Sequence, residues 1–112
     1  MPYKPYVPKG VGELLAYLAH MLLASPTFKD KTGYLPRENI HTTFYSLNEG
    51  LLAVRKKLGE ERYATLRALS DRMRALFEAD PEDKTGETEA GQMLIHEMED
   101  ILRSAAKRPA PK

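Results

Sequence analysis

The stretch that decides the fold spans residues 37–58 and reads RENIHTTFYSLNEGLLAVRKKL. Its large apolar side chains recur at alternating steps of four and three residues, at Ile40, Phe44, Leu47, Leu51, Val54 and Leu58. This spacing puts them on one face of an α-helix that packs against other helices. Pro36 suits the first turn of such a helix, and Gly59 can end it. We therefore expect a central amphipathic helix that runs from about Arg37 to Leu58.

Two further faces of this helix are informative. His41, Tyr45, Asn48 and Leu52 lie together on one flank, about 110° from the apolar face when each residue turns the helix by about 100°. The other flank carries small residues, which let a neighbouring helix approach closely: Ser46, Gly50 and Ala53. A helix that is apolar or small on three sides is normally central in its fold.

The chain predicts three more helices around the central one. The first spans Val11 to Ala24 and ends at Ser25-Pro26, because proline disfavours α geometry in the residue before it. The connection that follows, residues 25–36, contains Phe28 and is expected to pack over one end of the bundle.

Another helix starts directly after Gly59 and forms a long antiparallel hairpin with the central helix. One helix continuing through Gly59 is the alternative, since a glycine costs only about 1 kcal/mol there. The last helix runs from about Glu87 to Ala106, after a turn-rich acidic segment at residues 80–86.

These elements predict an all-α protein, a compact four-helix bundle with up-down topology. We expect a single domain over residues 1–112, with an extended arm at 1–9, the bundle at 10–107 and a flexible tail at 108–112. The arm repeats proline at every third residue, which favours an extended conformation. Its tyrosines, Tyr3 and Tyr6, could contact a neighbouring surface, for example that of a second copy.

The charge of the chain is segregated although its net charge is only +1. Residues 55–77 carry seven basic and three acidic side chains, and residues 78–102 carry one basic and nine acidic side chains. Residues 103–112 carry four basic side chains and no acidic one. No dominant basic face results, which argues against nucleic-acid binding. The basic cluster of Arg55, Lys56, Lys57 and Arg62 could contact phosphate, or could serve only helix capping and solubility.

The flank of the central helix is the best candidate for a ligand site. Histidine can exchange protons near neutral pH, and the tyrosine and asparagine could orient a bound group. The candidate ligand-binding residues are therefore His41, Tyr45 and Asn48, joined by His20 from the first helix. The alternative is that these side chains satisfy one another, or form an interface, with no ligand.

No motif for a metal, a cofactor or catalysis stands out. Glu97 and Asp100 resemble half of the carboxylate pattern of all-α nucleotide pyrophosphohydrolases, but the second half, Glu-Glu-x-x-Glu, is broken by Ala64. A metal-dependent hydrolase that uses Glu97, Glu99 and Asp100 is thus the weakest hypothesis. The chain lacks cysteine and an apolar run of membrane-spanning length, so we expect no disulfide, no membrane segment and a cytoplasmic setting.

The leading functional hypothesis is a small protein-interaction or regulatory module without catalysis. It would bind a protein partner, or form a homodimer, through surplus apolar faces and an acidic patch. The candidate interaction residues are Tyr3, Tyr6, Leu52, Glu82, Asp83, Glu87 and Glu89. The alternatives are a ligand-binding bundle with the pocket described above, and an acidic inhibitor or immunity-type protein for a basic partner.

Overall fold

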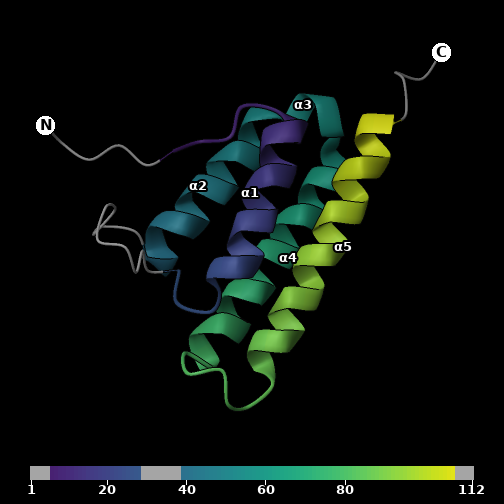
Figure 1. The fold of residues 1–112 in the computed structure, drawn as a ribbon. Helices are drawn as coiled ribbons and strands as arrows, with labels where there is room; N and C mark the ends of the chain where they lie inside the picture. Colours follow the sequence, from purple (N-terminus) through teal and green to yellow (C-terminus); the bar gives the residue numbers. More distant parts are fainter. Residues whose placement is uncertain (1–5, 29–38, 108–112) are drawn as a thin grey trace, which may run out of the picture.

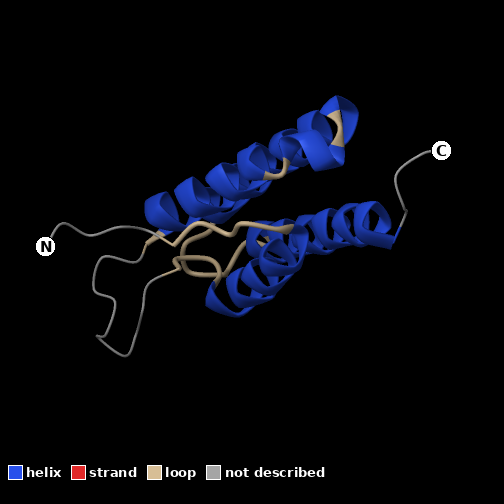
Figure 2. Cartoon of the chain, turned by 90° about the horizontal axis from the view of Figure 1, so that it is seen from above, coloured by secondary structure: helices blue, strands red, loops and turns tan. Residues whose placement is uncertain are grey.

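The computed structural model describes residues 6–28 and 39–107, and these ranges form five helices and no strand (Figures 1 and 2). The helices are α1 (Val11–Ala24), α2 (Ile40–Ala53), α3 (Arg55–Leu58), α4 (Glu60–Ala79) and α5 (Glu87–Lys107). In Figure 1 the four long helices run alternately down and up. Both α1 and α4 pack against α2 and α5. The predicted all-α class and the packing of the helices as a bundle are confirmed.

Several sequence-based boundaries match the structure closely. The bounds of α1 are those predicted, and α1 ends where Ser25 adopts extended backbone before Pro26. The predicted last helix matches α5 to within one residue. The expectations for residues 1–5, 29–38 and 108–112 lie outside the described residues. Within the described ranges, no helix is long and apolar enough to cross a membrane.

The start of the central helix differs from the prediction. The helix was expected from about Arg37, but it begins at Ile40, and its N-cap is Asn39. The Asn39 side chain accepts hydrogen bonds from the backbone N–H groups of His41 (2.8 Å) and Thr42 (3.1 Å). The Thr42 hydroxyl in turn accepts a hydrogen bond from the Asn39 backbone N–H (3.0 Å). This reciprocal box satisfies amide groups that the first turn of a helix otherwise leaves unpaired.

The predicted continuous helix to Leu58 is wrong at one residue. Val54 leaves α geometry, with φ −106° and ψ 11°, and its N–H bonds to the carbonyls of Leu51 and Leu52. The single turn α3 follows, and both Val54 and Leu58 are buried. Gly59 then separates α3 from α4 with a φ of 88°, which glycine adopts without strain. A helix continuing through Gly59 is therefore excluded.

An aromatic cluster fills one end of the core. Phe28, which follows α1, packs edge-on against Phe44 of α2 (5.8 Å between ring centroids) and Phe77 of α4 (5.2 Å). All three rings are buried. The prediction that the segment after α1 packs over one end of the bundle holds for Phe28.

Two glycines let neighbouring segments approach closely. A Cβ atom at Gly50 of α2 would lie 2.9 Å from a methyl carbon of Leu14, so α1 is the helix that approaches the small flank of α2 at this point. A Cβ atom at Gly91 of α5 would lie 2.6 Å from the Phe77 ring. Because Phe77 is held by two other rings, it has little room to move away.

We expect Gly91→Ala to lower the free energy of unfolding by about 1–3 kcal/mol, because the new methyl group overpacks the aromatic cluster. Chemical denaturation followed by circular dichroism measures this change. Gly12→Ala is the matched control, since no atom lies within 4 Å of its added Cβ. The control should leave stability unchanged or raise it by up to about 1 kcal/mol. Equal effects of the two changes would contradict the close contact at Gly91.

Candidate functional site

We define the α2 outer face as His41, Tyr45, Asn48 and Leu52, the flank singled out from the sequence. Two of its members are tied to α4. Arg74 Nη2 donates to His41 Nδ1 (2.6 Å), and the Ser70 hydroxyl donates to Asn48 Oδ1 (2.7 Å). The other two project outward, since Tyr45 is 51% exposed and Leu52 is 47% exposed. The α2 outer face is therefore partly a seam between helices and partly an open apolar surface.

The arginine at this seam has several partners. Besides its bond to His41, Arg74 pairs with Glu78 on its own helix (3.4 Å). Its guanidinium also lies 5.9 Å from the ring centroid of Phe44. These contacts fix the Arg74 side chain between α2 and α4. One ring nitrogen of His41 is therefore occupied by a hydrogen bond within the protein.

His20 has a different environment. It is exposed on α1, with its ring 6.1 Å from that of Tyr17. Among the interactions of the described residues, none joins His20 to His41, Tyr45 or Asn48. The pocket expected near these four residues stays a prediction.

The described part of the N-terminal arm, residues 6–9, packs against α1, the helix that follows it in the chain. The Tyr6 hydroxyl donates to Glu13 Oε1 of α1 (2.8 Å), and its ring is 5.7 Å from that of Tyr17. The hydrogen bond with Glu13 raises the pKa of Tyr6 and lowers the pKa of Glu13. Pro8 is buried beside Gly50 of α2. Tyr3 lies outside the described residues.

Asp80 organises the acidic segment before α5. It is 2% exposed, and its carboxylate accepts hydrogen bonds from the backbone N–H groups of Lys84 (2.7 Å), Thr85 (3.2 Å) and Thr88 (3.0 Å). Burial raises the pKa of this carboxyl, but the hydrogen bonds from Lys84, Thr88 and Thr85 outweigh burial and lower the pKa to about 2. Asp80 therefore stabilises the start of α5, a role that the sequence analysis did not assign to it.

The four acidic residues expected to bind a partner are exposed or nearly so. Glu82 pairs with Lys84 (3.1 Å), and Glu87 contacts the Thr85 hydroxyl. Asp83 has left-handed backbone with a φ of 56°. Glu89 lies exposed on the first turn of α5. Two of these carboxylates thus have a local partner within the segment.

The carboxylates of α5 do not converge on one point. Glu99 is 7% exposed and contacts His96 Nδ1 (3.0 Å), while Glu97 and Asp100 lie on the exposed side of the helix. In residues 6–28 and 39–107, no group of three or more histidine, aspartate and glutamate side chains is placed to hold a metal ion. This arrangement gives the hydrolase hypothesis no support.

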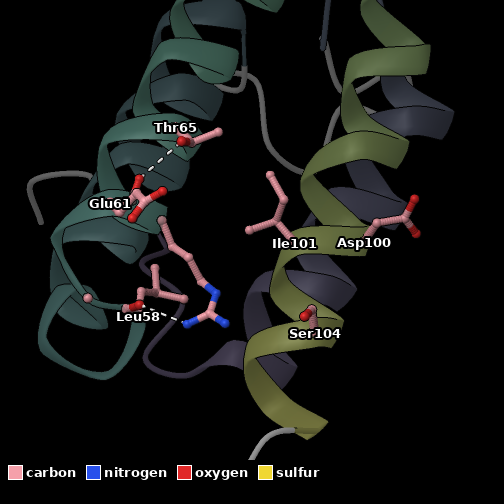
Figure 3. Close-up of a pocket in the computed structure, with 8 residues that line it drawn as sticks. Leu58, Glu61, Thr65, Asp100, Ile101 and Ser104 are labelled. Atoms are coloured by element: carbon pink, nitrogen blue, oxygen red, sulfur yellow. Dashed lines mark hydrogen bonds between the residues drawn. The ribbon is translucent and has the colours of Figure 1, made fainter.

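A pocket that the sequence analysis missed lies where α3, α4 and α5 meet (Figure 3). Its volume is about 680 Å³, and we call it the end pocket. It is lined by Leu58, Gly59, Glu61, Arg62, Thr65, Asp100, Ile101 and Ser104. The basic cluster that includes Arg62 was the only sign of this pocket in the sequence. The spacing of residues along the chain could not show that α5 packs opposite this cluster. None of the α2 outer face residues lines this pocket.

A smaller pocket of about 370 Å³ lies between the end of α1 and the acidic segment. Its lining includes Leu23, Pro26 and Pro81, together with Glu82 and Asp83. The predicted ligand-binding residues do not line it either.

The chain matches no protein-family model, and no curated protein or solved structure is similar enough to count as a match.

We expect Asp80→Asn to lower the melting temperature by about 5 °C at pH 7, because the amide accepts the three backbone hydrogen bonds less well. The ionised Asp80 stabilises the fold above its ordinary pKa of 3.8, and this stabilisation is lost as the pH falls through about 2. The difference between variant and wild type should therefore shrink as the pH is lowered across this window. Differential scanning fluorimetry at several pH values measures it.

The control for this prediction is Asp83→Asn, an exposed neighbour whose left-handed backbone suits asparagine. It should melt close to the wild type throughout the series. A difference for Asp80→Asn that stays constant down to pH 2 would show that its carboxylate charge does not stabilise the fold.

Proposed function

We propose that this protein is a small interaction module, an up-down four-helix bundle that self-associates through the α2 outer face. The observation that carries the proposal is the pair Tyr45 and Leu52, two large side chains that are each about half exposed. They are seven residues apart, which is two helical turns or about 10 Å along one side of α2. Exposed apolar groups that share one side of a helix are typical of protein-binding surfaces.

Charges along α4 support a second copy as the partner. Beside the α2 outer face, α4 presents the pairs Arg67–Asp71 (3.7 Å) and Arg74–Glu78 (3.4 Å). This border carries both signs in equal number. A surface of mixed charge can complement itself when two copies meet around a two-fold axis.

The size of the surface sets the expected strength. A stable dimer buries roughly 800 Å² per partner. One helix flank with two half-exposed anchors provides much less, and Tyr45 and Leu52 would supply most of the binding energy. We therefore expect reversible association that depends on protein concentration.

The other hypotheses receive less support from the geometry. A ligand site on the α2 outer face would have to displace the bonds of His41 to Arg74 and of Asn48 to Ser70. An acidic inhibitor would present its carboxylates freely, whereas Glu82 pairs with Lys84 and Glu87 contacts the Thr85 hydroxyl. These alternatives would gain support if the protein bound a small molecule or a basic protein without self-associating.

We expect the double variant Tyr45→Ser/Leu52→Ser to lose self-association, because it removes both apolar anchors and leaves the buried core intact. Sedimentation velocity over a series of protein concentrations should show a sedimentation coefficient that rises for the wild type and stays constant for the variant. Circular dichroism spectra of the two proteins should overlay.

Leu23→Ser is the matched control, since Leu23 is 88% exposed on α1 and is not part of the α2 outer face. It should associate like the wild type. A wild-type protein that stays monomeric at every concentration would refute self-association. If Leu23→Ser lost self-association to the same extent, the association would have to involve a surface other than the α2 outer face.

A further inference from the structure

The end pocket is separate from the α2 outer face, so its function can be argued independently. Its volume lies within the range of about 300–1,000 Å³ that is usual for small-molecule sites. Its accessible apolar lining comes mainly from Ile101, which is partly buried, because Leu58 is 2% exposed and belongs to the core beneath the pocket. Figure 3 shows the Ile101 side chain pointing from α5 towards α4. The exposed part of Ile101 can contact a short apolar group.

Arg62 is a positively charged residue of the pocket lining that makes few contacts within the protein. Its Nη1 donates to the Leu58 carbonyl at 3.3 Å, a long bond that caps α3 (Figure 3). No carboxylate of the described residues forms an ion pair with Arg62. A guanidinium has five N–H donors, so most of those of Arg62 remain available to a ligand.

The acidic residues of the lining form no ion pair with Arg62. Asp100 points away from α4 in Figure 3 and lies 3.8 Å from Arg103. Glu61 sits in the first turn of α4, where a negative charge is favoured by the helix dipole. Both carboxylates stay at the border of the pocket, where they disfavour a ligand with several negative charges.

The surrounding charge favours a ligand with one negative charge. Residues 55–62 and 100–105, which meet at this end of the bundle, carry five basic and three acidic side chains. The Thr65 hydroxyl donates to the Glu61 carbonyl (3.0 Å), whereas the Ser104 hydroxyl makes no hydrogen bond with the described residues. Ser104 therefore adds a second free donor to those of Arg62.

We propose that the end pocket binds a small aliphatic monocarboxylate. Its carboxylate accepts hydrogen bonds from Arg62 and Ser104, and its hydrocarbon chain packs on Ile101. A guanidinium suits a carboxylate because two parallel N–H···O bonds can form. A phosphate group with two charges fits less well, because Glu61 and Asp100 border the pocket.

The experiment titrates the full-length, ¹⁵N-labelled protein with sodium octanoate at constant ionic strength and follows backbone amide signals by NMR. Octanoate is chosen because it carries one charge and about eight carbon atoms. A ligand of this size reaches a Kd on the order of 1 mM, so the titration extends to about 20 mM. We expect saturable shifts at Gly59, Thr65 and Ser104, and none at Leu52 or Gly12.

Two variants test the contacts within the pocket. Arg62→Gln should weaken octanoate binding by about tenfold or more, because it removes the charge-assisted hydrogen bonds. The matched control is Arg72→Gln, an exposed arginine of the same helix outside the pocket, which should bind like the wild type. Ile101→Ser keeps Arg62 and its bond to Leu58, and should also weaken binding by shortening the apolar surface. It keeps the proposal testable if Arg62→Gln unfolds.

Several outcomes would overturn the proposal. The first is the absence of saturable shifts at the pocket amides. The second is an equal response to octylamine, which would show that only the hydrocarbon part of the ligand contributes to binding and that Arg62 does not recognise the carboxylate. The third is a response to inorganic phosphate but not to octanoate. The fourth is equal weakening by Arg72→Gln and Arg62→Gln. Since none of these readouts involves association, they leave the proposal for the α2 outer face untouched.

Discussion

The packing of Phe77 is the contact on which the arrangement of the helices depends. Its ring meets Phe28 and Phe44, and it fills the space that Gly91 leaves on α5. One side chain of α4 thereby touches α2, α5 and the segment that follows α1. Because the backbone of α5 comes so close to α4 here, the two helices are locked at this end. At their other end the end pocket opens between them, and Ile101 reaches across.

The sequence predicted the fold well where local patterns decide the structure. The bounds of α1 follow from its apolar spacing and from Ser25-Pro26, which need no tertiary information. The break at Val54 could not be predicted, because the seam of apolar residues continues through it without interruption. The contact of Gly91 with Phe77 was equally hidden, since it depends on the register between α4 and α5. Asp80 was missed because its backbone partners come from a loop with no regular pattern.

The candidate sites show the same division between local and tertiary information. Helical spacing correctly grouped the α2 outer face on one flank, and it could not reveal that Arg74 and Ser70 would engage two of its members. Which residues of α4 become partners depends on the register in which α4 packs against α2. The end pocket combines side chains from α3, α4 and α5, some 40 residues apart in the chain, so spacing along the sequence carries no sign of it. Grouping the residues of a single helix identified the α2 outer face. The end pocket could be found only from the packing of three helices.

The alternating direction of the helices also gives the molecule two electrically different ends. The turn at α3 and the last turns of α5 meet at one end in Figure 1, and the acidic segment between α4 and α5 lies at the other. Sequence blocks of opposite sign are thus converted into a dipole along the bundle. Such a dipole turns an approaching molecule before contact, so a negatively charged ligand or surface meets the α3 end first. The orienting effect reaches about 8 Å at physiological ionic strength and fades as salt is added.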